Sequence, residues 1–271
     1  MTEDQQSLPD IDRISVVIST ILLSYAVVPF IDIPQHFIDF RLGGIIFSFP
    51  IRLTEIIGVL AAALAALGTD WLIQSHPRSG HQGTWQHVII PALTAWVIGV
   101  PLNSIRIGQE WWAIFTFGGL LLILVVVAEY LVVDLSNVSH MPAVIGLTAV
   151  SFALYLVVAI VIRTAQTRLY LQLPALVVTL LLVCLRALYL HLGGRWCLGW
   201  SIGISLFVGQ LAIGLHYLPL SPLAFGLILI GPAYALTSFV VSVEESRPLG
   251  ISLIEPLIML VSLWMLALIF G

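Results

Sequence analysis

The side chains best suited to chemistry are charged residues placed within or beside long apolar runs. Glu129 lies in VVVAEYLVVD, Arg186 lies in LLVCLRALYLHLGGRW, and Asp70 ends an alanine-rich run. A charge at the centre of a membrane helix costs roughly 2.5–3.5 kcal/mol and normally finds a partner. When consecutive apolar runs cross a membrane in alternation, all three charges fall towards the same side. This placement predicts that Arg186 pairs with Glu129, with Asp70 as the second candidate carboxylate.

Polar residues recur along the apolar run that contains Arg186. Gln172, Thr179 and Arg186 are seven residues apart, which is nearly two helical turns, so they share one face of a helix. Such a polar seam in a membrane helix should face other helices or a wet cavity rather than lipid. Tyr155 lies on a polar face of the preceding apolar run. The candidate intramembrane polar site comprises Glu129, Arg186, Thr179, Gln172, Tyr155 and Asp70.

Two interpretations of these charges stay open. Arg186 and Glu129 fit either a structural ion pair that fixes the register of two helices, or a substrate or proton site. Asp70 is followed by Trp71, and tryptophan is enriched where helices meet the membrane surface. An interfacial position is therefore the favoured interpretation for Asp70.

Motifs of known catalytic chemistry are missing from the sequence. It contains no GxSxG, no HExxH and no Walker loop, so serine-hydrolase, zinc-protease and ATP-driven roles have no support. All ten basic residues are arginine, which excludes a lysine Schiff base. His76, His81 and His87 share one polar loop, and their loose spacing favours a solvated loop over a zinc site. The sequence predicts no catalytic residue, no metal site and no cofactor.

The composition places these residues in a membrane protein. Of 271 residues, 60% are hydrophobic and 9% are charged, whereas soluble domains carry about 25% charged residues. A soluble fold has no interior large enough to hide this much apolar surface, so the solvent must be lipid. The chain has no run of basic residues, which excludes nucleic acid as a partner. The expected partner is the lipid bilayer.

Nine apolar runs approach the roughly 20 residues that a membrane-spanning helix needs. We predict helices over 14–31, 50–73, 88–105, 111–133, 143–163, 170–192, 198–218, 223–243 and 252–270. The predicted fold class is all-α, a polytopic bundle of about nine transmembrane helices. A polar, acidic tail over 1–13 precedes a single transmembrane domain over 14–271, and residues 32–49 are expected to form an interfacial segment. The arginines divide almost evenly between the two sides, so the positive-inside rule leaves the orientation open.

The predicted helix over 198–218 carries small or polar residues on two faces. One face has Gly199, Gly203, Gln210 and Gly214, and the other has Ser201, Ser205, Gly209 and His216. Small residues allow membrane helices to approach closely. We therefore expect this helix to have close neighbours on two sides.

Three segments of the chain carry a family resemblance. LAALGTDWLIQSHP (64–77), VVVAEYLVVD (125–134) and LHYLPLSPLAFGLILIGPAYALT (215–237) resemble an uncharacterised family of bacterial polytopic membrane proteins. The similarity extends over most of the chain, and the family has no assigned activity. The resemblance implies a bacterial cytoplasmic (inner) membrane as the location and transfers no catalytic residue.

Three functional hypotheses follow from these observations. The first is a transporter or permease for a small solute or a lipid-like molecule, with the polar seam lining its site. The second is a structural or assembly subunit, whose partners would be other membrane subunits. The third is an intramembrane enzyme acting on a lipid, with carboxylates and histidines as acid–base groups. The absence of an organised nucleophile or metal set makes an enzyme the least favoured of the three.

Overall fold

The structure is a computed structural model of the chain. It describes residues 10–30, 36–42, 45–51, 53–75, 84–133, 140–166, 168–246 and 253–270. Histidines 76 and 81, most of the predicted tail and Arg247 lie outside these ranges.

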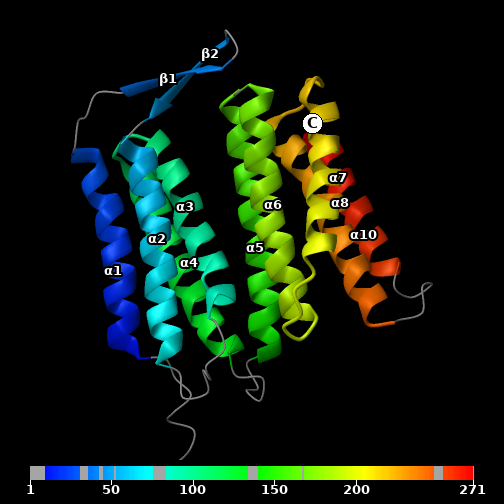
Figure 1. The fold of residues 1–271 in the computed structure, drawn as a ribbon, viewed down its shortest axis with the longest axis horizontal. Helices are drawn as coiled ribbons and strands as arrows, with labels where there is room; N and C mark the ends of the chain where they lie inside the picture. Colours follow the sequence, from blue (N-terminus) through cyan, green and yellow to red (C-terminus); the bar gives the residue numbers. More distant parts are fainter. Residues whose placement is uncertain are drawn as a thin grey trace, which may run out of the picture. The chain divides into compact units, whose positions relative to one another are not determined.

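Long helices dominate the described residues (Figure 1). They are α1 (Ile11–Val27), α2 (Leu53–Gln74), α3 (Ile89–Ser104), α4 (Gln109–Val132), α5 (His140–Thr164), α6 (Leu169–His191), α7 (Leu198–His216), α8 (Pro222–Glu244) and α10 (Ile254–Phe270). Eight are long and apolar enough to cross a membrane, and α10 is a shorter apolar helix. Short 3₁₀ turns, η2 (Val28–Phe30) and η3 (Trp85–His87), flank two of them. The prediction of an all-α polytopic bundle is confirmed, and the chain is an integral membrane protein.

One hairpin of two strands was not predicted. β1 (His36–Leu42) pairs in antiparallel fashion with β2 (Ile45–Ile51), with His36 opposite Ile51 and Leu42 opposite Ile45. The second predicted helix therefore begins at Leu53 rather than at residue 50. Seven-residue strands suit these two segments because both are rich in β-branched and aromatic residues.

The first helix begins earlier than the sequence indicated. Asp10 is its N-cap and accepts a hydrogen bond from the backbone N–H of Asp12 at 3.0 Å. Asp12 itself lies in the first turn, where a carboxylate is favoured by the helix dipole. The predicted boundary between tail and helix at 13/14 thus lies inside α1.

The helices form two compact units, residues Met1–His140 and Met141–Gly271. The single domain expected over 14–271 stays a prediction. In the first unit each helix packs on the next, and α4 closes back onto α1. Its core is apolar and includes Ile21, Ala65, Ala95, Leu122 and Val126.

The packing of the first unit depends on close approaches at glycine. A methyl group at Gly118 of α4 would lie 2.6 Å from a methyl carbon of Ile98 in α3, so an alanine there would force Ile98 or a helix to shift. Tyr25 of α1 lies over Gly99 of α3 and donates a hydrogen bond to the carbonyl of Ala95 at 2.6 Å. Small residues at helix contacts bring the backbones together, which is how membrane helices gain packing energy without a hydrophobic drive.

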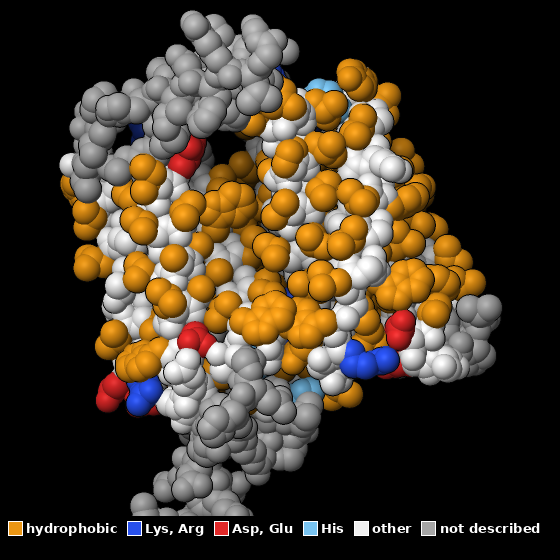
Figure 2. Space-filling view, viewed as in Figure 1, with side chains coloured by type: hydrophobic (Ala, Val, Ile, Leu, Met, Phe, Trp, Pro, Cys, Tyr) orange, Lys and Arg blue, Asp and Glu red, His pale blue; other side chains and the backbone are white. Residues whose placement is uncertain are grey.

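In the second unit, α8 is the helix with the most partners. It packs against α6, α7 and α10, and its Gly226 accommodates Leu156 of α5. Ser221 caps its start by accepting from the N–H of Ala224, and Pro222 follows as the first helical residue. Hydrophobic side chains cover much of the helical surface that Figure 2 shows, while charged side chains lie near helix ends.

The helix predicted over 198–218 is α7, which packs against both α6 and α8, but its glycine face takes no part in these contacts. Gly209 of α7 fits closely against Val177 of α6. On the opposite face, Gly199, Gly203 and Gly214 have no described atom within 4 Å of the position of a Cβ. One face of α7 is therefore buried and the glycine face is exposed.

Candidate functional site

The first unit contains a buried pair of ionisable side chains. The Nδ1 atom of His87 lies 2.9 Å from Oε2 of Glu129, within hydrogen-bond distance. The side chain of His87 is 10% exposed and that of Glu129 is 0% exposed. His87 belongs to η3, just before α3, and Glu129 lies in the last turn of α4. The interpretation of His87 as part of a solvated loop is therefore wrong.

Asp70 holds the segment that carries His87. Its Oδ1 accepts a hydrogen bond from the hydroxyl of Thr84, and its Oδ2 accepts one from the side-chain amide of Gln74 at 2.6 Å. Thr84 is the residue before η3, and its carbonyl accepts from the N–H of His87 at 3.0 Å. Asp70 thus lies at the same end of the first unit as the His87–Glu129 pair and braces it through Thr84.

The start of α1 brings further charge to this end of the first unit. Arg13 forms an ion pair with Asp10 at 3.4 Å, and its guanidinium lies 4.7 Å from the ring centroid of Trp71. Tyr130, next to Glu129, is buried and interacts electrostatically with both Asp10 and Arg13. Four segments, α1, α2, η3 and α4, therefore place ionisable groups together.

In the second unit, the polar seam of α6 is buried along its length. Gln172, Thr179 and Arg186 are 3%, 4% and 0% exposed. The guanidinium of Arg186 lies 5.4 Å from the ring centroid of Tyr189, one turn further along α6. Burial of three polar side chains on one helix face agrees with the argument that such a face avoids lipid.

Polar contacts connect α6 with three other helices of its unit. At one end, Oε1 of Gln172 lies 2.9 Å from Nδ1 of His216 in α7. At the other end, His191 Nε2 lies 3.2 Å from the hydroxyl of Thr148 in α5. Between them, the sulfur of Cys184 lies 3.5 Å from the hydroxyl of Thr237 in α8. Tyr155 of α5 is 1% exposed and interacts electrostatically with Cys184.

The candidate residues therefore fall into two groups. Asp70 and Glu129 belong to the first unit, whereas Tyr155, Gln172, Thr179 and Arg186 belong to the second. The pairing of Arg186 with Glu129 stays a prediction. Within the described ranges, no group of three His, Cys, Asp or Glu side chains is arranged to hold a metal ion.

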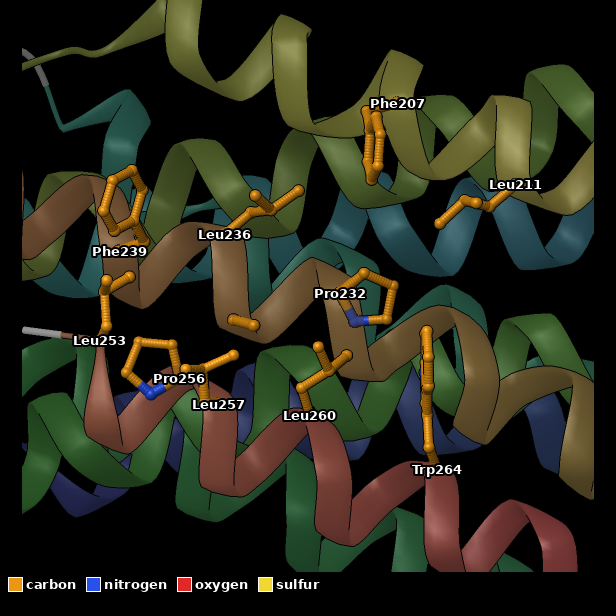
Figure 3. A pocket seen from close by; sticks show the side chains of 11 residues that line it. Phe207, Leu211, Pro232, Leu236, Phe239, Leu253, Pro256, Leu257, Leu260 and Trp264 are labelled. Atoms are coloured by element: carbon orange, nitrogen blue, oxygen red, sulfur yellow. The ribbon is translucent and has the colours of Figure 1, made fainter.

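The second unit also has an apolar groove (Figure 3). It has a volume of about 400 Å³ and lies among α7, α8 and α10. Its lining includes Phe207, Pro232, Phe239, Leu257 and Trp264, and every other lining side chain is also apolar. Its chemistry suits an apolar occupant and offers no group for catalysis.

His87 is the residue of this site that sequence reasoning missed. Glu129 lies near a helix C-terminus, where the dipole disfavours a carboxylate, so it needs a partner on that membrane side. His87 immediately precedes the apolar run of α3, which starts on the same side. The combination of a misplaced carboxylate and a histidine at the start of the preceding helix was the available signal.

Comparisons with known proteins identify a family but no characterised relative. The comparison with curated proteins and the comparison with solved structures give no match. A family model matches residues 33–270, which is most of the chain. This span contains η3, α4, the α6 seam and the apolar groove. The chain therefore belongs to the family described as "Protein of unknown function (DUF5656)".

Proposed function

We propose that the protein is a transporter or permease that moves a small solute or a lipid-like molecule along the α6 seam of the second unit. The observation that supports this proposal is the burial of Gln172, Thr179 and Arg186 on one face of α6. Gln172 and Arg186 are fourteen residues apart, which at 1.5 Å per residue is about 21 Å of helix length. Polar groups are thus available through most of the membrane thickness, which is about 30 Å for the hydrocarbon core.

The neighbours of the seam support a path that can open. The side-chain contacts at Gln172, Cys184 and His191 each join α6 to a different helix, so they can separate when the helices move. Pro232 lies inside α8, one turn and a half before Thr237. A proline inside a helix removes a backbone hydrogen bond and allows bending, which suits α8 as a moving part.

The second candidate is a structural or assembly subunit of a membrane complex. The exposed glycine face of α7 favours it, because small residues on a helix surface allow another membrane helix to approach. Under this hypothesis the seam is closed by its own side chains and the partners are other membrane subunits. An intramembrane lipid-modifying enzyme is the third candidate, supported by the acid–base pair His87–Glu129. For each candidate we infer the cytoplasmic membrane of a bacterium as the location.

Cysteine accessibility separates the first two candidates. In a background with Cys184→Ala and Cys197→Ser, we would compare Thr179→Cys with Val178→Cys in sealed vesicles. The two positions have the same depth, but Thr179 is buried in the seam and Val178 is 54% exposed on the outer surface. The thiolate is the nucleophile that attacks a thiol reagent, and a cysteine needs access to water to form it.

A membrane-impermeant, charged thiol reagent is the probe. A transporter predicts that Thr179→Cys reacts at least about ten-fold faster than Val178→Cys, a difference equivalent to about 1.4 kcal/mol in barrier. Equal, negligible rates at both positions in folded protein would show that the seam is dry, which contradicts transport along it and supports the structural role. Size-exclusion elution and thermal unfolding confirm that each variant is folded.

A further inference from the structure

We propose that the apolar groove of the second unit binds one acyl chain of a zwitterionic phospholipid, with the headgroup beside Arg195 and Glu244. The groove lies among α7, α8 and α10 and has a volume of about 400 Å³. This volume is within the roughly 300–1,000 Å³ of pockets that bind small molecules. The proposal does not depend on transport along the α6 seam.

The groove has α8 as its floor and α7 and α10 as its walls. α8 packs against both other helices, and Figure 3 shows its lining residues between those of α7 and those of α10. The floor includes Pro232 and Ala235, and the walls include Phe207 and Leu257. A polar ligand would lose hydrogen bonds to water here and gain none, so the lining favours a hydrocarbon chain.

Trp264 fixes the inner end of the groove. Pro232 has no N–H, so it cannot donate the helical hydrogen bond that the carbonyl of Ile228 would accept. The indole Nε1 of Trp264 donates to this carbonyl instead, at 3.3 Å. A Cβ at Gly231 would lie 3.1 Å from the same nitrogen, so the ring packs closely against the backbone of α8. The inner end is therefore preformed.

The groove has the length of one membrane leaflet. It extends from Leu253, just before α10, to Trp264 at its inner end (Figure 3). These residues are eleven positions apart, which at 1.5 Å per residue is about 16 Å. Half of a hydrocarbon core of about 30 Å is about 15 Å. An acyl chain of one leaflet matches this length, whereas a membrane-spanning helix of another protein molecule would need a groove about twice as long.

The side of the groove is open to the lipid-facing surface. Phe207, Leu257 and Trp264 line the groove and are half-exposed. The apolar surface continues beside them with Leu206 and Ile258, which are also exposed. An acyl chain can therefore enter the groove sideways from the bilayer without crossing a polar surface.

An ion pair lies beyond the outer end of the groove. From Phe239, which lines the groove, α8 continues for five residues, or about 7.5 Å, to Glu244. Glu244 pairs with Arg195 at 3.4 Å and accepts a hydrogen bond from Nε1 of Trp200 at 3.1 Å. The Arg195 side chain is 62% exposed, and a guanidinium has five N–H donors. Arg195 can therefore bind a phosphate while it stays paired with Glu244.

The charges near this end favour a headgroup that carries both signs. The sequence around Arg195 and the connection between α8 and α10 contains the carboxylates Glu244, Glu245 and Glu255 and the arginines Arg195 and Arg247. An anionic headgroup is typically bound by a cluster of basic residues, and these residues have no surplus of positive charge. A phosphate beside Arg195 and an amine beside Glu244 complement the ion pair, which is the charge pattern of phosphatidylethanolamine.

The test is native mass spectrometry of the full-length protein in detergent micelles. The protein is titrated with phosphatidylethanolamine, phosphatidylglycerol or a free fatty acid of the same chain length. We expect one phosphatidylethanolamine to bind per chain. Ala235→Phe should lower its affinity about ten-fold, equivalent to about 1.4 kcal/mol, because the new ring fills the floor of the groove. Met265→Phe adds a ring on the exposed surface of α10 and should leave the affinity unchanged.

A second pair of variants tests the headgroup. Arg195→Gln should remove the preference for phosphatidylethanolamine over the fatty acid. Arg168→Gln removes an exposed arginine at the start of α6, at the opposite end of the unit, and should keep the preference. The proposal is overturned if the wild type binds no phospholipid, if folded Ala235→Phe binds as tightly as the wild type, or if phosphatidylglycerol or the fatty acid binds more tightly. A dimer that is lost in Ala235→Phe would also overturn it and assign the groove to a second copy of the chain.

Photochemical crosslinking of the wild type covers the case in which Ala235→Phe fails to fold. Phosphatidylethanolamine with a diazirine at the inner end of one acyl chain is added to vesicles that contain the protein. After illumination, we expect label to concentrate at Pro232 and Trp264, at the inner end of the groove. Val178, in the middle of α6, is exposed outside the groove and should carry much less label. Label spread over Val178 and the groove in proportion to their exposure would refute the site.

Discussion

Replacement of Gly99 by alanine is the most direct test of how the first unit is held together. At this position a methyl carbon would lie 2.7 Å from the hydroxyl oxygen of Tyr25 and 2.8 Å from its Cε1 atom. Tyr25 is 2% exposed and its hydroxyl donates to the carbonyl of Ala95 at 2.6 Å. The ring cannot move away from the new methyl group without losing this hydrogen bond.

The expected magnitude is the sum of three effects. Alanine gains about 1 kcal/mol over glycine in a helix interior. Overpacking of a closely fitted contact costs about 1–3 kcal/mol, and loss of the hydrogen bond from Tyr25 costs about 1 kcal/mol between membrane helices. Gly99→Ala should therefore lower the free energy of unfolding by about 1–3 kcal/mol.

Equilibrium unfolding in mixed micelles of a mild detergent and dodecyl sulfate is the assay. Gly58→Ala is the matched control, because its methyl carbon would lie 3.7 Å from Trp96, an ordinary contact. It should keep or raise the stability. Tyr25→Phe combined with Gly99→Ala should cost less than the sum of the single changes, because the hydrogen bond is lost only once. Equal stability of Gly99→Ala and Gly58→Ala would refute the close contact between α1 and α3.

Three other predictions concern the second unit and the charged residues. Gly209→Ala should lower the free energy of unfolding by about 1–3 kcal/mol, because its new methyl carbon would lie 2.7 Å from a methyl carbon of Val177 in α6. Gly203→Ala should not lower it, because no described atom lies within 4 Å of the position of its Cβ. Thermal unfolding of the two variants compares them. Arg163→Gln should lower the free energy of unfolding by about 1–3 kcal/mol, because the guanidinium donates to the carbonyls of His216, the last residue of α7, at 3.0 Å and of Leu218 at 2.6 Å; an unchanged melting temperature would contradict this. Arg186→Leu and Glu129→Leu should each reduce the yield of folded protein, and the double variant should recover part of it if the two residues form the predicted pair. A yield of the folded double variant no higher than that of the worse single variant would count against the pair.

The positions of the helices follow from the lengths of the apolar runs. The run predicted over 223–243 is α8, Pro222–Glu244, and its start is sharp because Ser221 and Pro222 cap it. The hairpin of β1 and β2 was missed although two seven-residue segments flank Gly43–Gly44 in the sequence. Such a pattern indicates a hairpin, whereas residues 32–49 were predicted to form an interfacial segment and the next helix to begin at residue 50.

The candidate site was predictable to the extent that it depends on one helix. A spacing of seven residues places Gln172, Thr179 and Arg186 on a common face, and all three are buried. Periodicity gives the face of a helix but not its neighbours. For that reason the contact of Glu129 with His87, and that of Gln172 with His216, required the three-dimensional structure.

The order of His87 and Glu129 along the chain has a consequence for biosynthesis. Because ribosomes synthesise the chain from its N-terminus, η3 and α3 reach the translocon before α4 does. Glu129 therefore partitions into a bilayer in which its imidazole partner is already present, and the carboxylate need not enter lipid alone. In a circularly permuted chain that begins with α4, the same carboxylate would enter first, and its insertion efficiency would measure how much the order of synthesis contributes.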